Sequence, residues 1–279
     1  MTVCDALVLS EMRLESSDIE SFKVEAKQLV AALLEMPLGE LVLRRTEPLT
    51  SEQEKIFVNW LERRANREPL QHILGVAPFY GLELAVNPNV LIPRPETERL
   101  TELVLEAVKE MPAPKILDVG TGSGAIALAL KHERPDAVVM ATDVSEVALS
   151  VAEENARRLG LEVSFALSDL LADPAVQTFA KEADVLVSNL PYLPDDDRNA
   201  VSPEVQRDPA TALYSGVDGL EHFRRLESEA FLLVRPGALC LLELDGRNVR
   251  EAAKVASRWA KTEVLEDLTG RERFLGLER

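Results

Sequence analysis

Apolar residues near the N-terminus recur at helical spacing, and then the pattern changes. Four of them predict one helical face: Leu29, Val30, Leu33 and Leu34. Pro37 breaks this segment, and a second helix is predicted from Thr50, a good N-cap residue with Gln53 three positions later. Short helices ahead of a different pattern indicate a small helical domain over residues 1–78.

Residues 79–95 carry two short β-prone runs. The first covers residues 79–86 and the second covers residues 90–92, with an Asn-Pro-Asn turn between them. Pro93 and Pro95 follow the second run and are expected to end it. We therefore predict a β-hairpin that links the helical domain to the rest of the chain.

From Lys115 onward, strand and helix patterns alternate. Strands are predicted at Lys115–Val119, Ala137–Asp143, Glu162–Ala166, Val185–Asn189, Ala238–Leu244, Glu263–Asp267 and Arg273–Leu277. Helices are predicted at Ala125–Glu133, Glu146–Leu159, Gly219–Leu233 and Asn248–Trp259. This alternation predicts an α/β domain over residues 96–279, with a doubly wound, mostly parallel seven-stranded sheet. The last two strands are too close for a crossover helix, so one should run antiparallel at or near an edge.

Composition narrows the class of protein. Hydrophobic residues make up 46% of the chain, enough for a sizeable core, yet no apolar run reaches the ~20 residues that span a bilayer. With no basic leader segment, we expect a soluble cytoplasmic protein that does not contact membranes. Cys4 and Cys240 form no paired motif, so we predict neither a disulfide nor a metal site. The net charge of −17 argues against stable nucleic-acid binding.

A glycine-rich turn follows the first strand of the α/β domain. It consists of Gly120, Thr121, Gly122, Ser123 and Gly124. Glycines let the backbone turn sharply and approach a ligand. Asp143 ends the next strand 19 residues after Gly124, where it can accept hydrogen bonds from ribose hydroxyls. The site is predicted to bind a cofactor that contains adenosine.

The glycines alone do not identify that cofactor. Gly120, Gly122 and Ala125 also satisfy the dinucleotide pattern, so a nicotinamide oxidoreductase is one alternative. Asp118 just before the turn favours S-adenosylmethionine (SAM), because the cationic sulfonium and ammonium of SAM attract carboxylates that would repel a pyrophosphate.

Asn189, Leu190, Pro191 and Tyr192 leave the fourth strand at the same sheet edge. The Asn189 side-chain carbonyl and a main-chain carbonyl near Leu190 can accept both hydrogens of an NH₂ group. Pro191 stiffens the turn, and Tyr192 offers a flat face for a planar amide or base. Taken alone, this segment reads as an ordinary loop exit. Beside the glycine turn, we predict that it binds and orients the methyl acceptor.

A third segment, Ser168-Asp169-Leu170, follows the third strand. Asp169 can accept from an adenine amino group while Leu170 packs on the ring. Asp169 as a helix N-cap is an equally good interpretation.

These motifs resemble a known family. Asn189 to Tyr192 is similar to the Asn/Asp/Ser-Pro-Pro-Tyr/Phe/Trp motif of SAM-dependent methyltransferases that modify exocyclic or amide nitrogens. Residues 90–98, Val-Leu-Ile-Pro-Arg-Pro-Glu-Thr-Glu, are more specific. Together with residues 68–75, 79–81, 208–213 and 242–244, they resemble the PrmC/HemK family of release factor glutamine methyltransferases.

The resemblance implies a class I SAM-dependent methyltransferase fold and a cytoplasmic, monomeric enzyme. Its substrate would be the amide nitrogen of the glutamine in the Gly-Gly-Gln loop of class I peptide chain release factors. We predict that the helical domain helps to dock that factor, because the catalytic crevice alone cannot present a buried loop glutamine; a cap that only stabilises the fold is an equally good interpretation. SAM would contact the glycine turn and also Asp143, Asp169, Leu170, Asn189, Arg94, Glu96 and Thr97. Asn189, Pro191 and Tyr192 would be catalytic, with no general base and no covalent intermediate.

Two residues depart from the family pattern. Leu190 replaces the usual first proline of the motif, and Leu170 stands where an aromatic residue often occurs. Leucine at the first of these positions also occurs in rRNA adenine dimethylases, so methylation of an adenine amino group in RNA or DNA is the second hypothesis for this chain.

Overall fold

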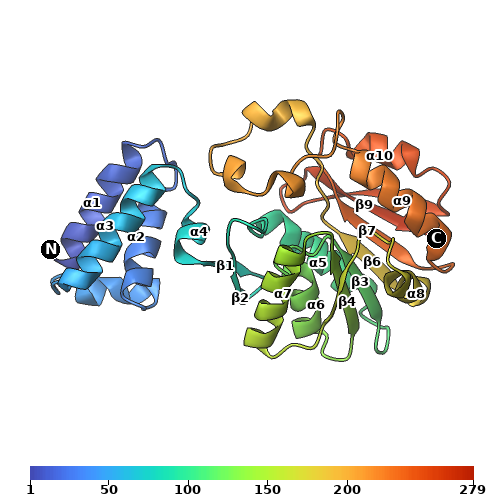
Figure 1. The fold of residues 1–279 in the computed structure, drawn as a ribbon, viewed down its shortest axis with the longest axis horizontal. Helices are drawn as coiled ribbons and strands as arrows, with labels where there is room; N and C mark the ends of the chain where they lie inside the picture. The colour runs from blue at the N-terminus through green and yellow to red at the C-terminus, as the bar shows by residue number, and fades with distance from the viewer. The chain divides into compact units, whose positions relative to one another are not determined.

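The computed structural model describes residues 1–279, which divide into two compact units (Figure 1). The helical unit contains Met1–Val76 and Ser202–Arg207, and the sheet unit contains Ala77–Val201 and Asp208–Arg279. No helix combines the length and the apolar character needed to cross a membrane.

The helical unit is a small bundle with its own apolar core. Its elements are α1 (Val3–Glu15), α2 (Phe22–Leu33), the 3₁₀ helix η1 (Leu38–Arg44), α3 (Ser51–Ala65) and α4 (Leu70–Leu74). The predicted helix start at Thr50 is confirmed, since the Gln53 N–H donates to the Thr50 hydroxyl and the Gln53 side chain accepts from the Thr50 N–H. Helix α1 falls within the predicted helical domain, although no bounds were predicted for it, and Thr2 and Asp5 cap it in the same way.

Arg64 is the buried charge of the helical unit. Its guanidinium pairs with Glu25 of α2 and donates to Glu204 at 2.9 Å. Arg67 donates to the same Glu204 carboxylate at 2.6 Å. Burial raises the pKa of Glu204, but the hydrogen bonds from Arg67 and Arg64 outweigh it and hold that pKa at about 2. These ion pairs attach the segment Ser202–Arg207 to the bundle.

The predicted hairpin exists, but its turn lies earlier in the chain. Strands β1 (Val76–Phe79) and β2 (Leu82–Ala85) meet at Tyr80-Gly81, where φ is +48° and +77°. Two positive φ angles in a two-residue loop favour a hairpin turn that matches the twist of the strands. Our placement of the turn at residues 87–89 was therefore wrong. Residues 90–92 are irregular, and Val90 and Ile92 are buried in an apolar cluster instead of pairing as a strand.

The seven-stranded sheet is confirmed, with the order β5-β4-β3-β6-β7-β9-β8. Its strands are β3 (Lys115–Val119), β4 (Val138–Asp143), β5 (Ser164–Leu167), β6 (Val185–Ser188), β7 (Leu239–Glu243), β8 (Lys261–Glu266) and β9 (Glu272–Glu278). Strand β9 runs antiparallel to both β7 and β8, and the pairings among β3 to β7 are parallel. The expected antiparallel strand thus lies next to the edge.

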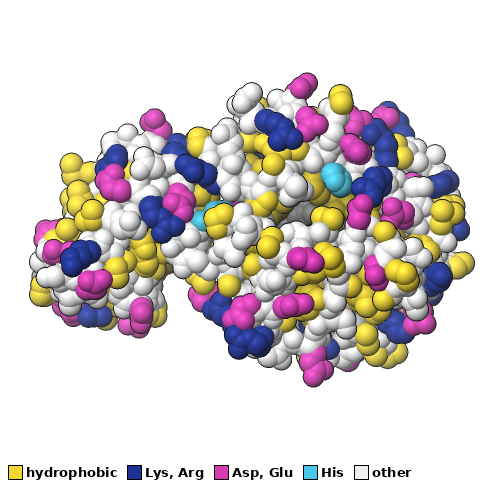
Figure 2. Space-filling model, in the orientation of Figure 1, with side chains coloured by type: hydrophobic (Ala, Val, Ile, Leu, Met, Phe, Trp, Pro, Cys, Tyr) yellow, Lys and Arg dark blue, Asp and Glu magenta, His cyan; other side chains and the backbone are white.

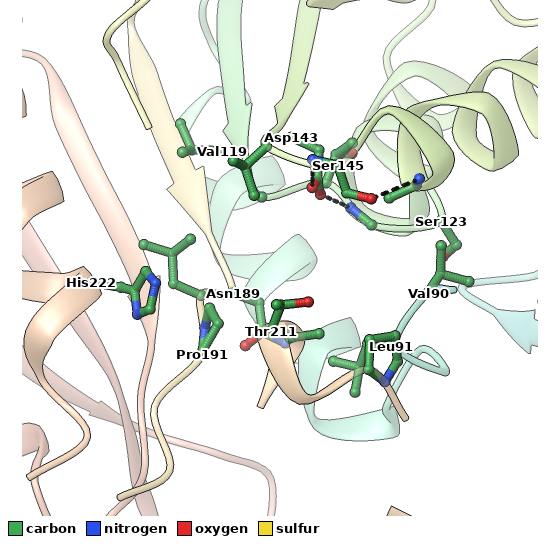
Figure 3. Close-up of a pocket in the computed structure, with 18 of the residues that line it drawn as sticks. Val90, Leu91, Val119, Ser123, Asp143, Ser145, Asn189, Pro191, Thr211 and His222 are labelled. Atoms are coloured by element: carbon green, nitrogen blue, oxygen red, sulfur yellow. Dashed lines mark hydrogen bonds between the residues drawn. The ribbon is translucent and has the colours of Figure 1, made fainter. Parts of the chain in front are cut away.

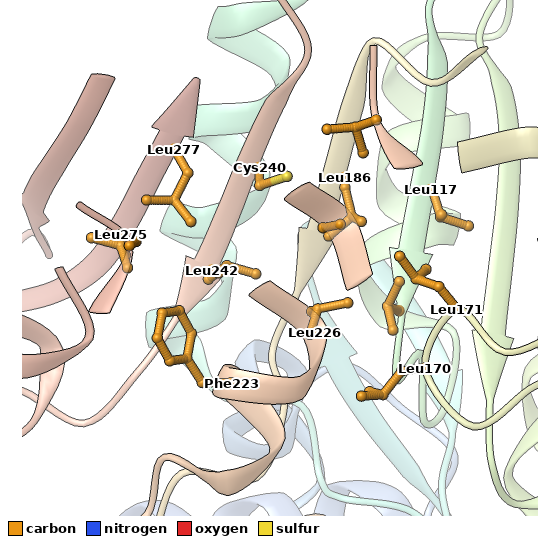
Figure 4. Close-up of a cluster of buried hydrophobic side chains, with 14 of the residues drawn as sticks. Leu117, Leu170, Leu171, Leu186, Phe223, Leu226, Cys240, Leu242, Leu275 and Leu277 are labelled. Atoms are coloured by element: carbon orange, nitrogen blue, oxygen red, sulfur yellow. The ribbon is translucent and has the colours of Figure 1, made fainter. Parts of the chain in front are cut away.

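Helices cover both faces of the sheet (Figure 1). One face carries α5 (Pro95–Ala107), α6 (Ala125–Glu133) and α7 (Glu146–Leu159), and the other carries α8 (Pro174–Glu182), α9 (Glu221–Leu233) and α10 (Val249–Val255). Successive residues of β3 alternate between the two cores, with Ile116 on the first and Leu117 on the second. Figure 4 shows the second core, where Leu117 and Leu242 lie with Phe223 of α9.

Helices α5 and α8 were not predicted, and both begin with a proline. Pro95 is expected from its local sequence to end a strand, but the structure has it in the first turn of α5, and Pro174 has the same place in α8. Proline is well suited there because its fixed φ is helical and its missing N–H would have no partner within the helix. The remaining short elements are the 3₁₀ helices η2 (Asp195–Asn199), η3 (Val205–Arg207) and η4 (Ala210–Ala212).

Candidate active site

A cavity of about 520 Å³ lies within the sheet unit, at the carboxyl ends of β3, β4, β5 and β6 (Figure 3). This is the edge where open α/β sheets bind ligands, and the volume suits a cofactor-sized molecule. The wall includes residues 89–91, 93–94, 119–123, 143–145, 168–170, 189–191 and 209–212. Three of the predicted residues, Gly124, Glu96 and Tyr192, do not belong to it.

The glycine turn forms the floor of the cavity. Gly120, Gly122 and Gly124 all have positive φ, from +57° to +85°, which favours glycine at each of the three positions. A Cβ at Gly120 would lie 2.9 Å from a side-chain carbon of Leu190, whereas one at Gly122 would meet no atom within 4 Å. Gly124 instead lets α6 approach α7, because a Cβ there would lie 3.2 Å from Ala152.

Thr121 and Ser123 line the cavity and are themselves buried. The Thr121 hydroxyl donates to Asp118 at 2.7 Å. Asp118 lies beneath the turn and outside the cavity wall, and burial raises its pKa to about 7. Asp118 therefore supports the turn through Thr121. Its carboxylate does not face the cavity, contrary to what we inferred from its place in the sequence.

Asp143 joins the turn to the end of β4. One carboxylate oxygen accepts from the Gly122 N–H at 2.9 Å, and the other accepts from the Ser145 N–H, also at 2.9 Å (Figure 3). Burial raises the pKa of Asp143, while these backbone N–H groups lower it. The carboxylate keeps lone pairs that can accept a ribose hydroxyl.

Asp169 and Leu170 form a second part of the wall. Asp169 pairs with Arg225 of α9 at 2.7 Å, and both line the cavity. The alternative of a helix N-cap is wrong, because Asp173 caps α8. Leu170 is only 5% exposed and has φ +51°, a strained conformation for a branched side chain. The Ser168 hydroxyl holds that conformation by donating to the Leu170 carbonyl at 2.8 Å.

Asn189 follows β6 and lines the cavity together with Leu190 and Pro191. The Asn189 Nδ2 donates to the Thr97 hydroxyl at 3.0 Å. Tyr192 turns away from the cavity wall, and its hydroxyl donates to Glu243 at 3.4 Å. Burial raises the pKa of the Tyr192 phenol well above its usual value. Tyr192 packs against the second core, so its ring does not form the expected flat face of the cavity.

Glu243, the last residue of β7, lies in a segment that carried the family resemblance, but no role in the site was predicted for it from the sequence. It is 1% exposed and accepts from the Thr97 hydroxyl at 2.8 Å. Burial raises its pKa to about 7, against the lowering effects of Thr97 and Arg273. A carboxylate that ends an apolar run, Leu239 to Leu242, was the available signal, because an acidic residue is rarely buried without a partner or a role.

Arg94 also lines the cavity, and it pairs with the buried Asp208. Burial raises the pKa of Asp208 to about 6, although Arg94 lowers it. This ion pair joins the loop before α5 to the wall segment 209–212. Glu96 is exposed and lies outside the wall.

Two further wall residues come from segments that carried no motif. His222 of α9 lies beside Pro191 (Figure 3), and its Nδ1 is 2.8 Å from the Ser215 hydroxyl. Arg198 of η2 is the other.

Comparison with known proteins agrees with this arrangement. Residues 5–75 match a family model described as the PrmC N-terminal domain, and residues 91–216 match the methyltransferase small domain. The release factor glutamine methyltransferase of Deinococcus radiodurans is 42% identical over 100% of this chain and 99% of its own length. That of Moorella thermoacetica is 38% identical over 100% of this chain and 99% of its own length.

A solved 16S rRNA methyltransferase from T. thermophilus, in complex with AdoMet and guanosine, shares the fold. It is 18% identical, with a TM-score of 0.52 over 73% of this chain and 49% of that one. The full-length relatives decide the family: this chain belongs to the release factor glutamine methyltransferases.

Proposed function

We propose that this protein transfers the methyl group of SAM to the side-chain amide nitrogen of the glutamine in the Gly-Gly-Gln loop of class I peptide chain release factors. The observation that carries the proposal is the position of the Asn189 amide, which lines the cavity directly beside the glycine turn in a chain 42% identical to an enzyme of that name. We propose the cytoplasm, where release factors act, as its location.

The cavity residues fit SAM. Gly120 and Gly122 leave the floor open to a ligand, and Asp143 offers lone pairs for the ribose hydroxyls. Leu170 can pack on the adenine ring, while Asp169 already has Arg225 as a partner and its contact with adenine would have to share that carboxylate. When bound, SAM supplies an electrophilic methyl group on a sulfonium.

Asn189 holds the methyl acceptor in this mechanism. Its Nδ2 is occupied by Thr97, so Oδ1 is the atom available to accept one hydrogen of the substrate NH₂. The main-chain carbonyl of Leu190 accepts the other hydrogen. Holding both hydrogens fixes the nitrogen in line with the methyl group, and such alignment lowers the activation free energy of the transfer by several kcal/mol. The mechanism needs no covalent intermediate, and the proton leaves to water.

Mass spectrometry of release factor incubated with the protein and SAM tests the reaction. We expect one added methyl group, on the Gly-Gly-Gln glutamine. Methyl transfer to RNA or DNA instead, with a steep dependence on salt, would overturn the proposal in favour of an adenine methyltransferase.

A variant pair tests the role of Asn189. We expect Asn189→Ala to abolish turnover while calorimetry still shows SAM binding. Asn199→Ala is the matched control, because Asn199 is exposed and outside the cavity wall. Equal loss of turnover and of SAM binding in Asn189→Ala would exclude the assigned role.

We also propose that the helical unit helps to dock the release factor. Figure 2 shows hydrophobic side chains (yellow) on the surface of the helical unit. The exposed apolar residues of this unit include Met12 at 64% and Leu43 at 79%, which lie outside its buried core. Met12→Asp and Leu43→Asp are therefore expected to lower kcat/KM for intact release factor and to leave methylation of a short Gly-Gly-Gln peptide unchanged. Unchanged kinetics with both substrates would mean that these side chains do not contact the factor.

A further inference from the structure

The direction in which the Asn189 amide points decides whether it can hold the substrate. Its oxygen accepts hydrogen bonds and its nitrogen donates them, although the two ends have nearly the same shape. The substrate amide nitrogen offers only N–H donors during binding. A productive site therefore needs Asn189 Oδ1, and not Nδ2, to face the cavity.

The hydrogen bonds around Asn189 impose that direction. Thr97 has a single hydroxyl hydrogen, which is directed at Glu243 Oε2 over 2.8 Å. An ionised carboxylate only accepts, so the Thr97 oxygen has only lone pairs left for a third group. Asn189 Nδ2 donates to this oxygen at 3.0 Å, which turns Oδ1 the other way.

We propose that Glu243 is a positioning residue whose carboxylate, acting through the Thr97 hydroxyl, orients the Asn189 amide so that its Oδ1 faces the methyl acceptor. This inference rests on the proposed function. The sheet fold brings the groups together from separate elements: Thr97 belongs to α5, Asn189 follows β6 and Glu243 ends β7.

The orientation depends on the charge of Glu243. If Glu243 is protonated, its hydroxyl can donate to Thr97, the Thr97 hydrogen is released toward Asn189, and the amide can flip. The groups that act on Glu243 are the Tyr192 hydroxyl, Arg273 of β9 and Glu96 of α5. Burial raises its pKa to about 7, so the charge changes near neutral pH.

The hydrogen bonds that connect Glu243, Thr97 and Asn189 form a relay, and steady-state kinetics with a matched pair of variants test it. Thr97→Val keeps the shape of the side chain and removes the hydroxyl, whereas Thr97→Ser keeps the hydroxyl. We expect kcat for release factor to fall about tenfold or more in Thr97→Val and to stay within about threefold in Thr97→Ser, since one wrongly directed hydrogen bond is worth about a factor of ten. Equal kcat values in the two variants would overturn the proposal.

The pH profile tests Glu243 itself. The kcat of the native protein is expected to fall as the pH drops below about 7, and Glu243→Gln is expected to lack this change. Retention of the same pH dependence in Glu243→Gln would overturn the proposal. Denaturation curves of each variant separate an effect on kcat from a loss of folded protein.

A measurement without substrate separates this inference from the proposed function. The side-chain N–H₂ signals of Asn189 in ¹⁵N spectra, assigned by their absence in Asn189→Ala, are expected to shift with pH near 7 in the native protein and not in Glu243→Gln. A pH-dependent shift without methyl transfer to release factor would support the relay and would reject the release factor as the substrate. Signals that do not respond to Glu243 ionisation would reject the relay, whatever the substrate is.

Discussion

Replacing Asn189 by aspartate tests the geometry of the relay through stability. Asn189 Nδ2 donates to Thr97 over 3.0 Å, and Thr97 donates to Glu243 over 2.8 Å. A carboxylate cannot donate, so Asn189→Asp would leave two carboxylates competing for one hydroxyl hydrogen. Both carboxylates would lie one hydrogen bond from the same Thr97 oxygen, about 5 Å apart for a near-tetrahedral angle at that oxygen, where unit charges at an effective dielectric of about 20 repel by about 3 kcal/mol, or about two pKa units.

The pH dependence of this variant follows from that repulsion. The repulsion would raise the pKa of Glu243 further above its native value of about 7. A raised folded-state pKa means that stability is lost as the pH rises, so the deficit of Asn189→Asp relative to the native protein appears above pH 7. Urea denaturation is expected to show that this deficit is about 1.4 kcal/mol larger at pH 8 than at pH 5.

The matched control for this experiment is Asn189→Ala, which loses the same hydrogen bond without adding a charge. Its deficit is expected to change by less than about 0.5 kcal/mol between the two pH values. If the deficit of Asn189→Asp were the same at pH 5 and pH 8, the reasoning that both groups share one hydroxyl would be refuted.

Three further predictions concern stability and the cofactor site. Gly120→Ala and Gly122→Ala both place alanine at positive φ, at about 1–2 kcal/mol each, and both add a methyl group to the cavity floor, so calorimetry should show weaker SAM binding for each. Only Gly120→Ala brings a Cβ to 2.9 Å from Leu190, so it should lower the free energy of unfolding more than Gly122→Ala, and equal losses would argue against that contact. Arg64→Ala leaves Glu25 without its cation, while Glu204 keeps Arg67, and should lower the free energy of unfolding by about 3 kcal/mol; a loss under about 1 kcal/mol would argue against the buried ion pair. Burial raises the pKa of Glu243 in the folded protein, so the ionised carboxylate destabilises the fold. The free energy of unfolding of the native protein, relative to that of Glu243→Gln, should therefore fall by about 3 kcal/mol as the pH rises from about 4.5 to about 7. The same pH dependence of unfolding in both proteins would contradict a raised pKa for Glu243.

The parts of the site that depend on local backbone chemistry could be predicted from the sequence. Helices α6 and α7 begin and end where their apolar spacing indicates. The glycine turn, Asp143 and the segment from Asn189 to Pro191 meet in one cavity, because the carboxyl ends of parallel strands share an edge.

The parts that the sequence did not reveal depend on contacts between distant residues. Thr97 and Glu243 are 146 positions apart, and no periodicity relates them. Arg225, which takes one side of the Asp169 carboxylate, comes from a helix whose exposed face looks like any solvated surface. Tyr192 has a motif position that suggests a cavity wall, yet the buried Glu243 carboxylate offers its hydroxyl a partner on the other side.

The sequence separation within the relay also bears on when the protein can become active during synthesis. The helical unit draws its bundle from Met1–Val76 and can form its core while the rest of the chain is still being made. The Asn189 amide, by contrast, acquires its direction only after Glu243 is released and β7 has paired with β6. Closing a contact over so long a chain is slow, because the entropy of the intervening loop is lost first. We therefore expect a nascent chain to complete the proposed methyl-acceptor site among the last steps of folding, after the glycine turn has formed.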